Sequence, residues 1–281
     1  MSNHVAVITD STACIPDQLA SQWGIRVVQV QLQVGDRLDD EHRFNRPELI
    51  AAMRAGEEVS TSPPEVGAFF WAYQDALSSG ASAVVSIHIS GRMSATARAA
   101  QEAAQQTPVP VHVVDSQTTG MSLGFAALSA ARAAAAGAQL RRVLDAATYR
   151  SQTSTELLYV DTLDYLRRGG RIGGAAAWVG TALSLKPLLT VREGEVRPVS
   201  RVPGRRRAQA KLVDLAVDRA GTRPVDVAVV RFGDDEQVLD LADQLRKRVR
   251  DVRDLVVAEA STVIGAHVGP GALGITVSPA G

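Results

Sequence analysis

"VVSIHISGRMSATARAA", residues 84–100, leads from an apolar strand directly into an alanine-rich helix. The turn between the two holds Ser90, Gly91, Ser94 and Thr96. The start of a helix presents N–H groups without intrahelical partners and a partial positive charge, so it suits an anion. This stretch therefore predicts an α/β fold with an anion-binding turn at the end of a strand.

Short Val- and Ile-rich runs alternate with amphipathic stretches in the first half of the chain, which is typical of a parallel α/β sheet. We expect strands at Val5–Thr9, Arg26–Val34, Ala83–Ile89, Val111–Asp115 and Leu157–Asp161. We expect helices at Pro16–Trp23, Pro47–Ala55, Pro64–Ser78, Ser94–Gln105, Ser122–Ala136 and Leu140–Arg150.

The pattern changes after Asp161. A short helix with a glycine break, "TLDYLRRGGRIGG", is followed by a predicted helix, "AAAWVGTALS", and by a hairpin, "KPLLTVREGEVRPVSRV". Further helices are expected at 205–219 and 236–248, and strands at 225–232, 255–260 and 273–277. Hairpins mixed with helices indicate an α+β unit. We therefore predict an N-terminal parallel-sheet α/β domain over residues 1–160 and a C-terminal α+β domain over 161–281.

Composition excludes several classes of protein. Thirty basic residues balance thirty acidic ones, whereas nucleic-acid binding needs a surplus of positive charge. The single cysteine, Cys14, allows no internal disulfide, and the histidines show no metal-ligand spacing. No signal peptide and no apolar run long enough for a membrane span is evident. We expect a cytoplasmic protein without a metal, a cofactor or an integral membrane segment.

Hydroxyl side chains precede two predicted helices. Thr61 and Ser62 in "STSPPE" are expected at a helix amino end, either as caps or as donors to a ligand in front of the helix. Ser94 allows the same two interpretations and a third, a catalytic nucleophile. The nucleophile-elbow pattern G-x-S-x-G is absent from the chain, which makes the nucleophile the weaker of the two functional interpretations.

Other candidates lie in turns and loops. Ser116 in "VDSQTTG" follows a strand and is expected beside Ser90 and Gly91 at the sheet edge where α/β proteins place ligands. Arg171, in "RRGGRIGG", is either a surface charge or a carboxylate clamp. His267 is expected in a glycine-rich loop, "VIGAHVGPGALG", as a structural or a ligand-contacting side chain. The basic run over 201–211 is a solvated face or a docking patch for an acidic partner.

Taken in order, seven motifs resemble the DegV family, which includes the FakB-type fatty-acid carriers of bacteria. They run nearly end to end: "VITDSTA", "TSPPE", "SIHISGRMSAT", "VDSQTTGMSLGF", "VDTLDYLRRGGRIG", "LSLKPLLTVREGEV" and "GAHVGPGALG". The resemblance implies two α/β domains with a long-chain fatty acid buried between and within them.

The resemblance also implies residue roles. Thr61 and Ser94 would hold the fatty-acid carboxylate, with His267 and Arg171 close to it; Ser62, Ser90, Gly91 and Ser116 are supporting candidates. Two positions depart from the family motifs. Ala95 stands where the family keeps a glycine, and Pro63 replaces a residue with a side-chain amide and a backbone donor.

The resulting prediction is a non-enzymatic carrier of a long-chain fatty acid such as palmitate, in lipid transport or fatty acid metabolism. Carriers of this kind present the bound acid to an ATP-dependent fatty acid kinase that makes acyl phosphate. Two alternatives stay open. One is an acyl hydrolase or transferase that uses Ser94 and His267, and the other is a lipid-sensing regulatory module.

Overall fold

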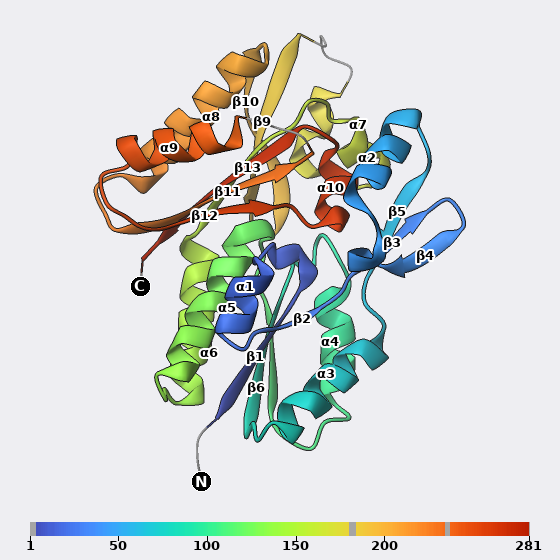
Figure 1. The fold of residues 1–281 in the computed structure, drawn as a ribbon, viewed down its shortest axis with the longest axis vertical. Helices are drawn as coiled ribbons and strands as arrows, with labels where there is room; N and C mark the ends of the chain where they lie inside the picture. Colours follow the sequence, from blue (N-terminus) through green and yellow to red (C-terminus); the bar gives the residue numbers. More distant parts are fainter. Residues whose placement is uncertain (1–3, 180–183, 234–236, 281) are drawn as a thin grey trace.

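The computed structural model describes residues 4–179, 184–233 and 237–280. Its first sheet is fully parallel and is built from strands in the order β2 (Arg26–Val28), β1 (Val5–Asp10), β6 (Ala83–His88) and β7 (Val111–Asp115) (Figure 1). Helices on both faces complete this unit: α1 (Asp17–Gln22), α3 (Val66–Ser78), α4 (Thr96–Ala104), α5 (Gly120–Ala135) and α6 (Leu140–Thr153). The predicted parallel α/β sheet is confirmed.

The two central strands of this sheet are buried on both faces, as parallel strands usually are. Side chains of β1 alternate between two hydrophobic clusters. Ala6 and Ile8 pack with residues of α3 and α4, whereas Val5 and Val7 pack with residues of α5 and α6. The continuous apolar runs in the sequence thus follow from helices covering each face.

The second sheet has six strands in mixed orientation. Their order is β10 (Glu195–Pro203), β9 (Leu185–Arg192), β8 (Thr155–Tyr159), β13 (Ala272–Pro279), β11 (Val225–Phe232) and β12 (Val252–Glu259). Only the β11–β12 pair is parallel among the pairs that the structure describes. The predicted hairpin is confirmed as β9 and β10. Strand β8 belongs to this sheet although it precedes residue 160, and the division of the chain at that residue stays a prediction.

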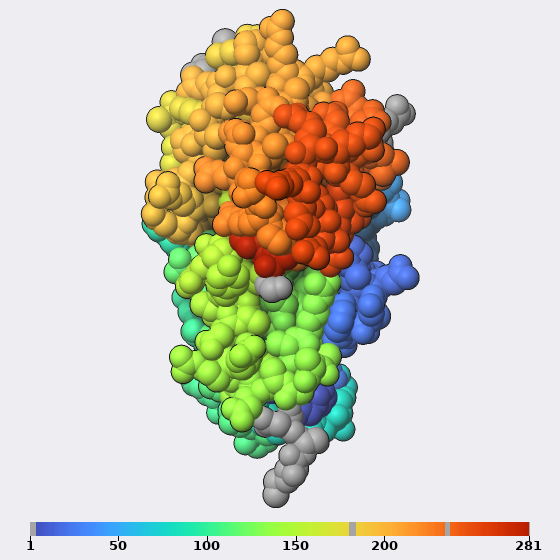
Figure 2. All heavy atoms as spheres, turned by 90° about the vertical axis from the view of Figure 1, so that its left-hand side faces the viewer, coloured from blue at the N-terminus to red at the C-terminus, as the bar shows by residue number. Residues whose placement is uncertain are grey.

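Helices α8 (Arg205–Ala220) and α9 (Val238–Arg248) cover one face of the six-stranded sheet, and α5 and α6 pack against the other. Figure 2 shows the orange surface of α8 and α9 above the green surface of α5 and α6. The predicted helix over 175–184 is, in its described part, a 3₁₀ helix that spans Gly173–Trp178. Residues 180–183 and Glu236, in the predicted helices, lie outside the described residues.

A third, small sheet was not foreseen. It is antiparallel, in the order β4 (Arg37–Asp40), β3 (Gln31–Val34) and β5 (Val59–Ser62), and it packs with α2 (Arg46–Ala55), α7 (Asp164–Arg168) and α10 (Thr262–Val268) around one side of the molecule (Figure 1). The single strand predicted over Arg26–Val34 is therefore wrong. The chain leaves the parallel sheet after Val28 and enters the small sheet at Gln31.

A buried ion pair joins α6 to the six-stranded sheet. Arg150 donates from Nη2 to Oδ2 of Asp226 at 2.5 Å, and the two side chains are 3% and 5% exposed. Arg150 Nη1 also donates to the carbonyl oxygen of Pro279. The contact therefore links the helix after the parallel sheet to β11 and to the end of β13.

We predict that Arg150→Met lowers the free energy of unfolding by about 3–5 kcal/mol, because Asp226 would be left as a buried charge without its partner. Denaturant unfolding measures this loss. The control is Arg141→Met on the same helix, which removes an exposed pair with Asp145 and should cost less than about 1 kcal/mol. Equal losses in the two variants would contradict the assignment.

Candidate ligand-binding cavity

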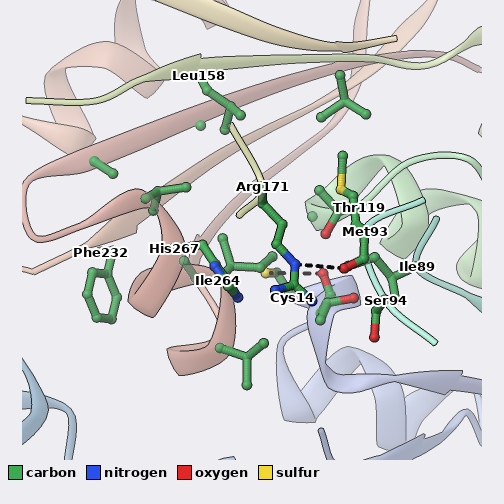
Figure 3. A pocket seen from close by; sticks show the side chains of 18 of the residues that line it. Cys14, Ile89, Met93, Ser94, Thr119, Leu158, Arg171, Phe232, Ile264 and His267 are labelled. Carbon is green, nitrogen blue, oxygen red and sulfur yellow. Dashed lines mark hydrogen bonds between the residues drawn. The ribbon is translucent and has the colours of Figure 1, made fainter. Parts of the chain in front are cut away.

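A cavity lies where the three sheets meet; we call it the central cavity. Its empty space is about 1140 Å³, part of which is open to solvent. Most of its walls are aliphatic or aromatic side chains from several elements: Val30, Ile89, Leu158, Leu166, Val191, Val196, Val230, Phe232, Val263, Ile264, Val268 and Leu273 (Figure 3). The wall chemistry suits an apolar ligand.

Polar side chains from separate elements gather at one end of the central cavity. Thr61, at the end of β5, and His267, on α10, are hydrogen-bonded with Oγ1 and Nε2 2.9 Å apart. Arg171 follows α7 and donates from Nε to the carbonyl oxygen of Met93 at 2.9 Å. Ser94 directly follows Met93 in the chain and lines the same cavity (Figure 3). The four residues predicted around a carboxylate thus line one cavity.

The imidazole of His267 is neutral at physiological pH. Burial and the neighbouring Arg171 lower its pKa from 6.5 to about 4. Its Nδ1 is buried without a hydrogen-bond partner among the described residues. A Cβ at Gly169 would lie 2.1 Å from this nitrogen, so only glycine at position 169 leaves room for the ring. The predicted glycine break in the "RRGG" segment therefore makes room for the ring of His267.

Two expectations about local structure are wrong. Thr61 and Ser62 do not start a helix: they end β5, and α3 begins at Val66 with Glu65 at its N-cap. His267 is not in a loop but in the last turn of α10. In both cases a nonlocal partner decides the conformation, since β5 pairs with β3 and α10 packs against β3 and β5.

Ser94 occupies the position that the strand–turn–helix pattern predicted. It lies two residues before α4, its Oγ accepts from the N–H of Thr96 at 3.3 Å, and it is 2.8 Å from Thr96 Oγ1. Ser94 therefore accepts from the first N–H of the helix while it also lines the cavity. Ala95 and Pro63, the two departures from the family motifs, line the cavity beside it.

The supporting candidates divide into two groups. Ser62 lines the central cavity. Ser90, Gly91 and Ser116 are not among its described lining residues and instead hold the turns together. Ser90 Oγ donates to the carbonyl oxygen of Gly194 at 2.8 Å, and the N–H of Gly91 donates to a carboxylate oxygen of Asp115 at 3.1 Å. Ser116 Oγ donates to the carbonyl oxygen of Thr118.

A second hollow, which reaches the surface, adjoins the polar end of the central cavity. Thr61, Arg171 and His267 line both. The outer rim of the hollow carries the polar side chains of Glu57, Glu58 and Arg168. A group bound beside Thr61 would therefore be close to solvent, whereas the apolar walls extend away into the protein.

Glu156 is a cavity residue that the sequence did not suggest. It lies on β8, is 3% exposed and lines the central cavity. Burial raises its pKa from 4.5 to about 7, against hydrogen bonds from Thr276 and Ser122 that lower it. The only available signal was one acidic residue in an otherwise apolar strand, "TELLYV".

No group of three or more His, Cys, Asp or Glu side chains in the described ranges is arranged to hold a metal ion. None of the described helices is sufficiently long and apolar to cross a membrane.

The model of one protein family, described as "Uncharacterised protein, DegV family", matches residues 4–280. The chain belongs to the DegV family. A DegV domain-containing protein of Streptomyces coelicolor is 44% identical over 279 residues, which is 99% of both chains. A DegV domain-containing protein of Mycobacterium tuberculosis is 39% identical over 274 residues, covering 97% of this chain and 96% of the relative.

Solved structures of DegV proteins share the fold over the whole chain. A DegV family protein from Thermus thermophilus, described as binding fatty acid, has a TM-score of 0.93 and 32% identity, with 99% of this chain and 100% of that chain covered. DegV from Bacillus subtilis, described as a fatty acid binding protein, has a TM-score of 0.89 and 27% identity at the same coverage. The predicted family and fold class are confirmed.

The pKa of Glu156 gives a test of the cavity's polarity. Its raised pKa contributes stability that is present below about pH 4.5 and is lost as the pH rises through about 7. Between pH 5 and 8 the free energy of unfolding should therefore fall by roughly 2–3 kcal/mol more in the native protein than in Glu156→Gln. Denaturant unfolding at several pH values measures the difference; parallel curves would show that Glu156 is ionised throughout.

Proposed function

We propose that this protein binds a long-chain fatty acid in the central cavity, with the carboxylate at Thr61, Ser94, His267 and Arg171. The observation that carries the proposal is the form of the cavity, whose walls are mostly apolar and whose end beside the surface hollow carries Thr61, Arg171 and His267. A fatty acid has the same division, with one carboxylate and a long apolar tail. The fatty-acid binding described for two DegV structures supports the same assignment.

The tail supplies most of the affinity in this proposal. Burial of roughly fourteen methylenes at about 0.8 kcal/mol each is worth on the order of 11 kcal/mol before the cost of association. Hydrogen bonds to a charged group contribute about 1.5–3 kcal/mol each. The polar end therefore sets the direction and depth of the ligand.

A non-enzymatic role is favoured over an acyl hydrolase or transferase. Ser94 Oγ is hydrogen-bonded to Thr96, whereas the imidazole of His267 is hydrogen-bonded to Thr61. A serine nucleophile needs a histidine base that is itself oriented by a third group. His267 Nδ1 contacts no such group among the described residues. This pair therefore supports binding and not nucleophilic attack.

Ser86, His88 and Asp10 form a serine–histidine–aspartate hydrogen-bond chain elsewhere in the protein, but it is inaccessible. Ser86 Oγ lies 2.6 Å from His88 Nε2, and His88 Nδ1 lies 3.0 Å from Asp10 Oδ2. All three residues are fully buried, and none is among the described residues that line the central cavity. With no path for a substrate, these contacts join β1 to β6 and supply no nucleophile.

A carrier role extends the proposal. The carboxylate would lie beside the surface hollow, where an ATP-dependent fatty acid kinase in the cytoplasm could reach it and form acyl phosphate. The basic run is a weaker basis for the alternative, a regulatory module with an acidic partner. Arg201 lies over the ring of Trp178, and Arg205 pairs with Asp161, so the exposed cations at the start of α8 are Arg206 and Arg207.

The purified protein should contain a fatty acid, because a ligand with a tail this large and buried dissociates slowly. Native mass spectrometry followed by organic extraction should find an acid of about 14–18 carbons. The family resemblance and the free energy gained by burying a long apolar tail both lead us to expect this length. Protein that holds no lipid and also fails to bind added palmitate would overturn the proposed function.

Removal of either hydroxyl should weaken binding of the acid. Thr61→Val and Ser94→Ala should each lower palmitate affinity by roughly 10–150-fold and lower hexadecanol affinity much less, because only the acid brings a charge to the lost hydrogen bond. Calorimetric titration of both ligands measures this. Ser78→Ala, at an exposed site on α3, is the control. Equal losses for acid and alcohol would place the carboxylate elsewhere.

A further inference from the structure

Glu156, a lining residue of the central cavity outside the four head-group residues, has one carboxylate oxygen that the described part of the protein does not pair. Glu156 Oε2 accepts three hydrogen bonds, from Ser122 N–H at 3.1 Å, Ser122 Oγ at 2.9 Å and Thr276 Oγ1 at 2.7 Å. No donor among the described residues reaches Oε1. Half of this carboxylate is therefore satisfied by the protein and the other half is not.

The cavity wall around Oε1 carries no side chains on two sides. A Cβ at Gly120 would lie 3.2 Å from this oxygen, and a Cβ at Gly274 would lie 3.3 Å from it. Both glycines line the central cavity. Thr119, next to Gly120, also lines the cavity, and its Oγ1 is buried without a partner in the described part of the chain. Two unsatisfied polar atoms thus lie on adjoining parts of one wall.

A purely structural role explains only part of this arrangement. Glu156 caps the amino end of α5 through Ser122, and one oxygen is sufficient for that. None of the described ion pairs includes Glu156. A buried polar atom without a partner costs about as much as a lost hydrogen bond. Oε1 therefore needs a donor that only the contents of the cavity can provide.

We propose that Glu156 Oε1, with Thr119 Oγ1 beside it, forms a second polar subsite that binds a hydroxyl group on the acyl chain. This inference rests on the proposed fatty-acid binding and narrows it to hydroxylated acids. When Glu156 is ionised, a chain hydroxyl donates its proton to Oε1, and its oxygen can accept from Thr119. A plain methylene leaves both atoms unpaired, and a ketone, which can accept from Thr119 but has no proton to donate, leaves Oε1 unpaired.

The test compares stearate with panels of monohydroxystearates and monoketostearates substituted along the chain, titrated into delipidated protein at about pH 8.5, where Glu156 is ionised. At one chain position the hydroxy acid should bind about tenfold or more tightly than stearate, and the matching keto acid should not. The position that responds also measures how deep the subsite lies.

Glu156→Gln provides the matched variant. Its amide oxygen can keep the three hydrogen bonds made to Oε2, which leaves the NH₂ group facing the cavity as a donor. The keto acid at the responsive position should then gain about tenfold over stearate, because a ketone accepts from this group. Glu156→Met should bind all three classes alike, and if it does not fold, Glu156→Gln alone decides.

The outcomes separate this inference from the proposed function. Equal binding of stearate and all its derivatives by the native protein would overturn the subsite, with an ordered water as the partner of Oε1, and would leave fatty-acid binding intact. A hydroxyl preference that persists unchanged in both Glu156 variants would also overturn it. Failure to bind any of the acids would overturn the proposed function and the subsite together.

Discussion

The buried carboxylate of Asp10 is the contact on which the arrangement of the cavity depends. It accepts from the N–H of Thr12 at 3.1 Å, from the N–H of Ile89 at 3.0 Å and lies 3.0 Å from His88 Nδ1. Neighbouring parallel strands β1 and β6 therefore end at one fully buried acceptor. The two turns that follow them carry Thr12 and Ser94 into the cavity wall, so the position of Ser94 is set by a group that never touches the ligand.

The apolar walls impose the neutral form on an acid and on a base. His267 contributes stability that is present above about pH 6.5 and is lost as the pH falls through about 4, because burial disfavours the imidazolium. Glu156 behaves in the opposite sense, since burial disfavours the carboxylate and raises its pKa to about 7. Between about pH 4 and pH 7 both side chains are therefore mostly uncharged. The cavity then presents hydrogen-bonding atoms without the cost of burying a charge on either residue.

Close packing decides the shape of the polar end. Gly169 is required because the imidazole of His267 occupies the space of a side chain there, and Arg171 is held by the carbonyl oxygens of Met93 and Gly169. The guanidinium thereby bridges the turn before α4 and the end of α7. Held in this way, Arg171 lines the same cavity as His267 and lowers the pKa of that imidazole. The positive charge of the site is therefore positioned by the contact between these two segments.

The sequence alone determined the parallel sheet, the hairpin, the family and the four head-group candidates. Continuous apolar strands, turn residues and ordered motifs are local signals, and local hydrogen bonds explain why Ser94 is where its pattern predicted. Arg171 and His267 were candidates because of their glycine-rich segments, and the resemblance added a role at the carboxylate, but neither signal gave their surroundings.

Only the tertiary structure decided how these residues meet. Thr61 is in a strand because it pairs with Leu32 of β3. The segment "STSPPE" suits a helix start equally well, and no local pattern indicates the small sheet. His267 meets Thr61, and Glu156 meets Thr276, across more than a hundred residues of the chain. Strand pairing and burial are nonlocal, so their effects on conformation and pKa have no signature in a short stretch of residues.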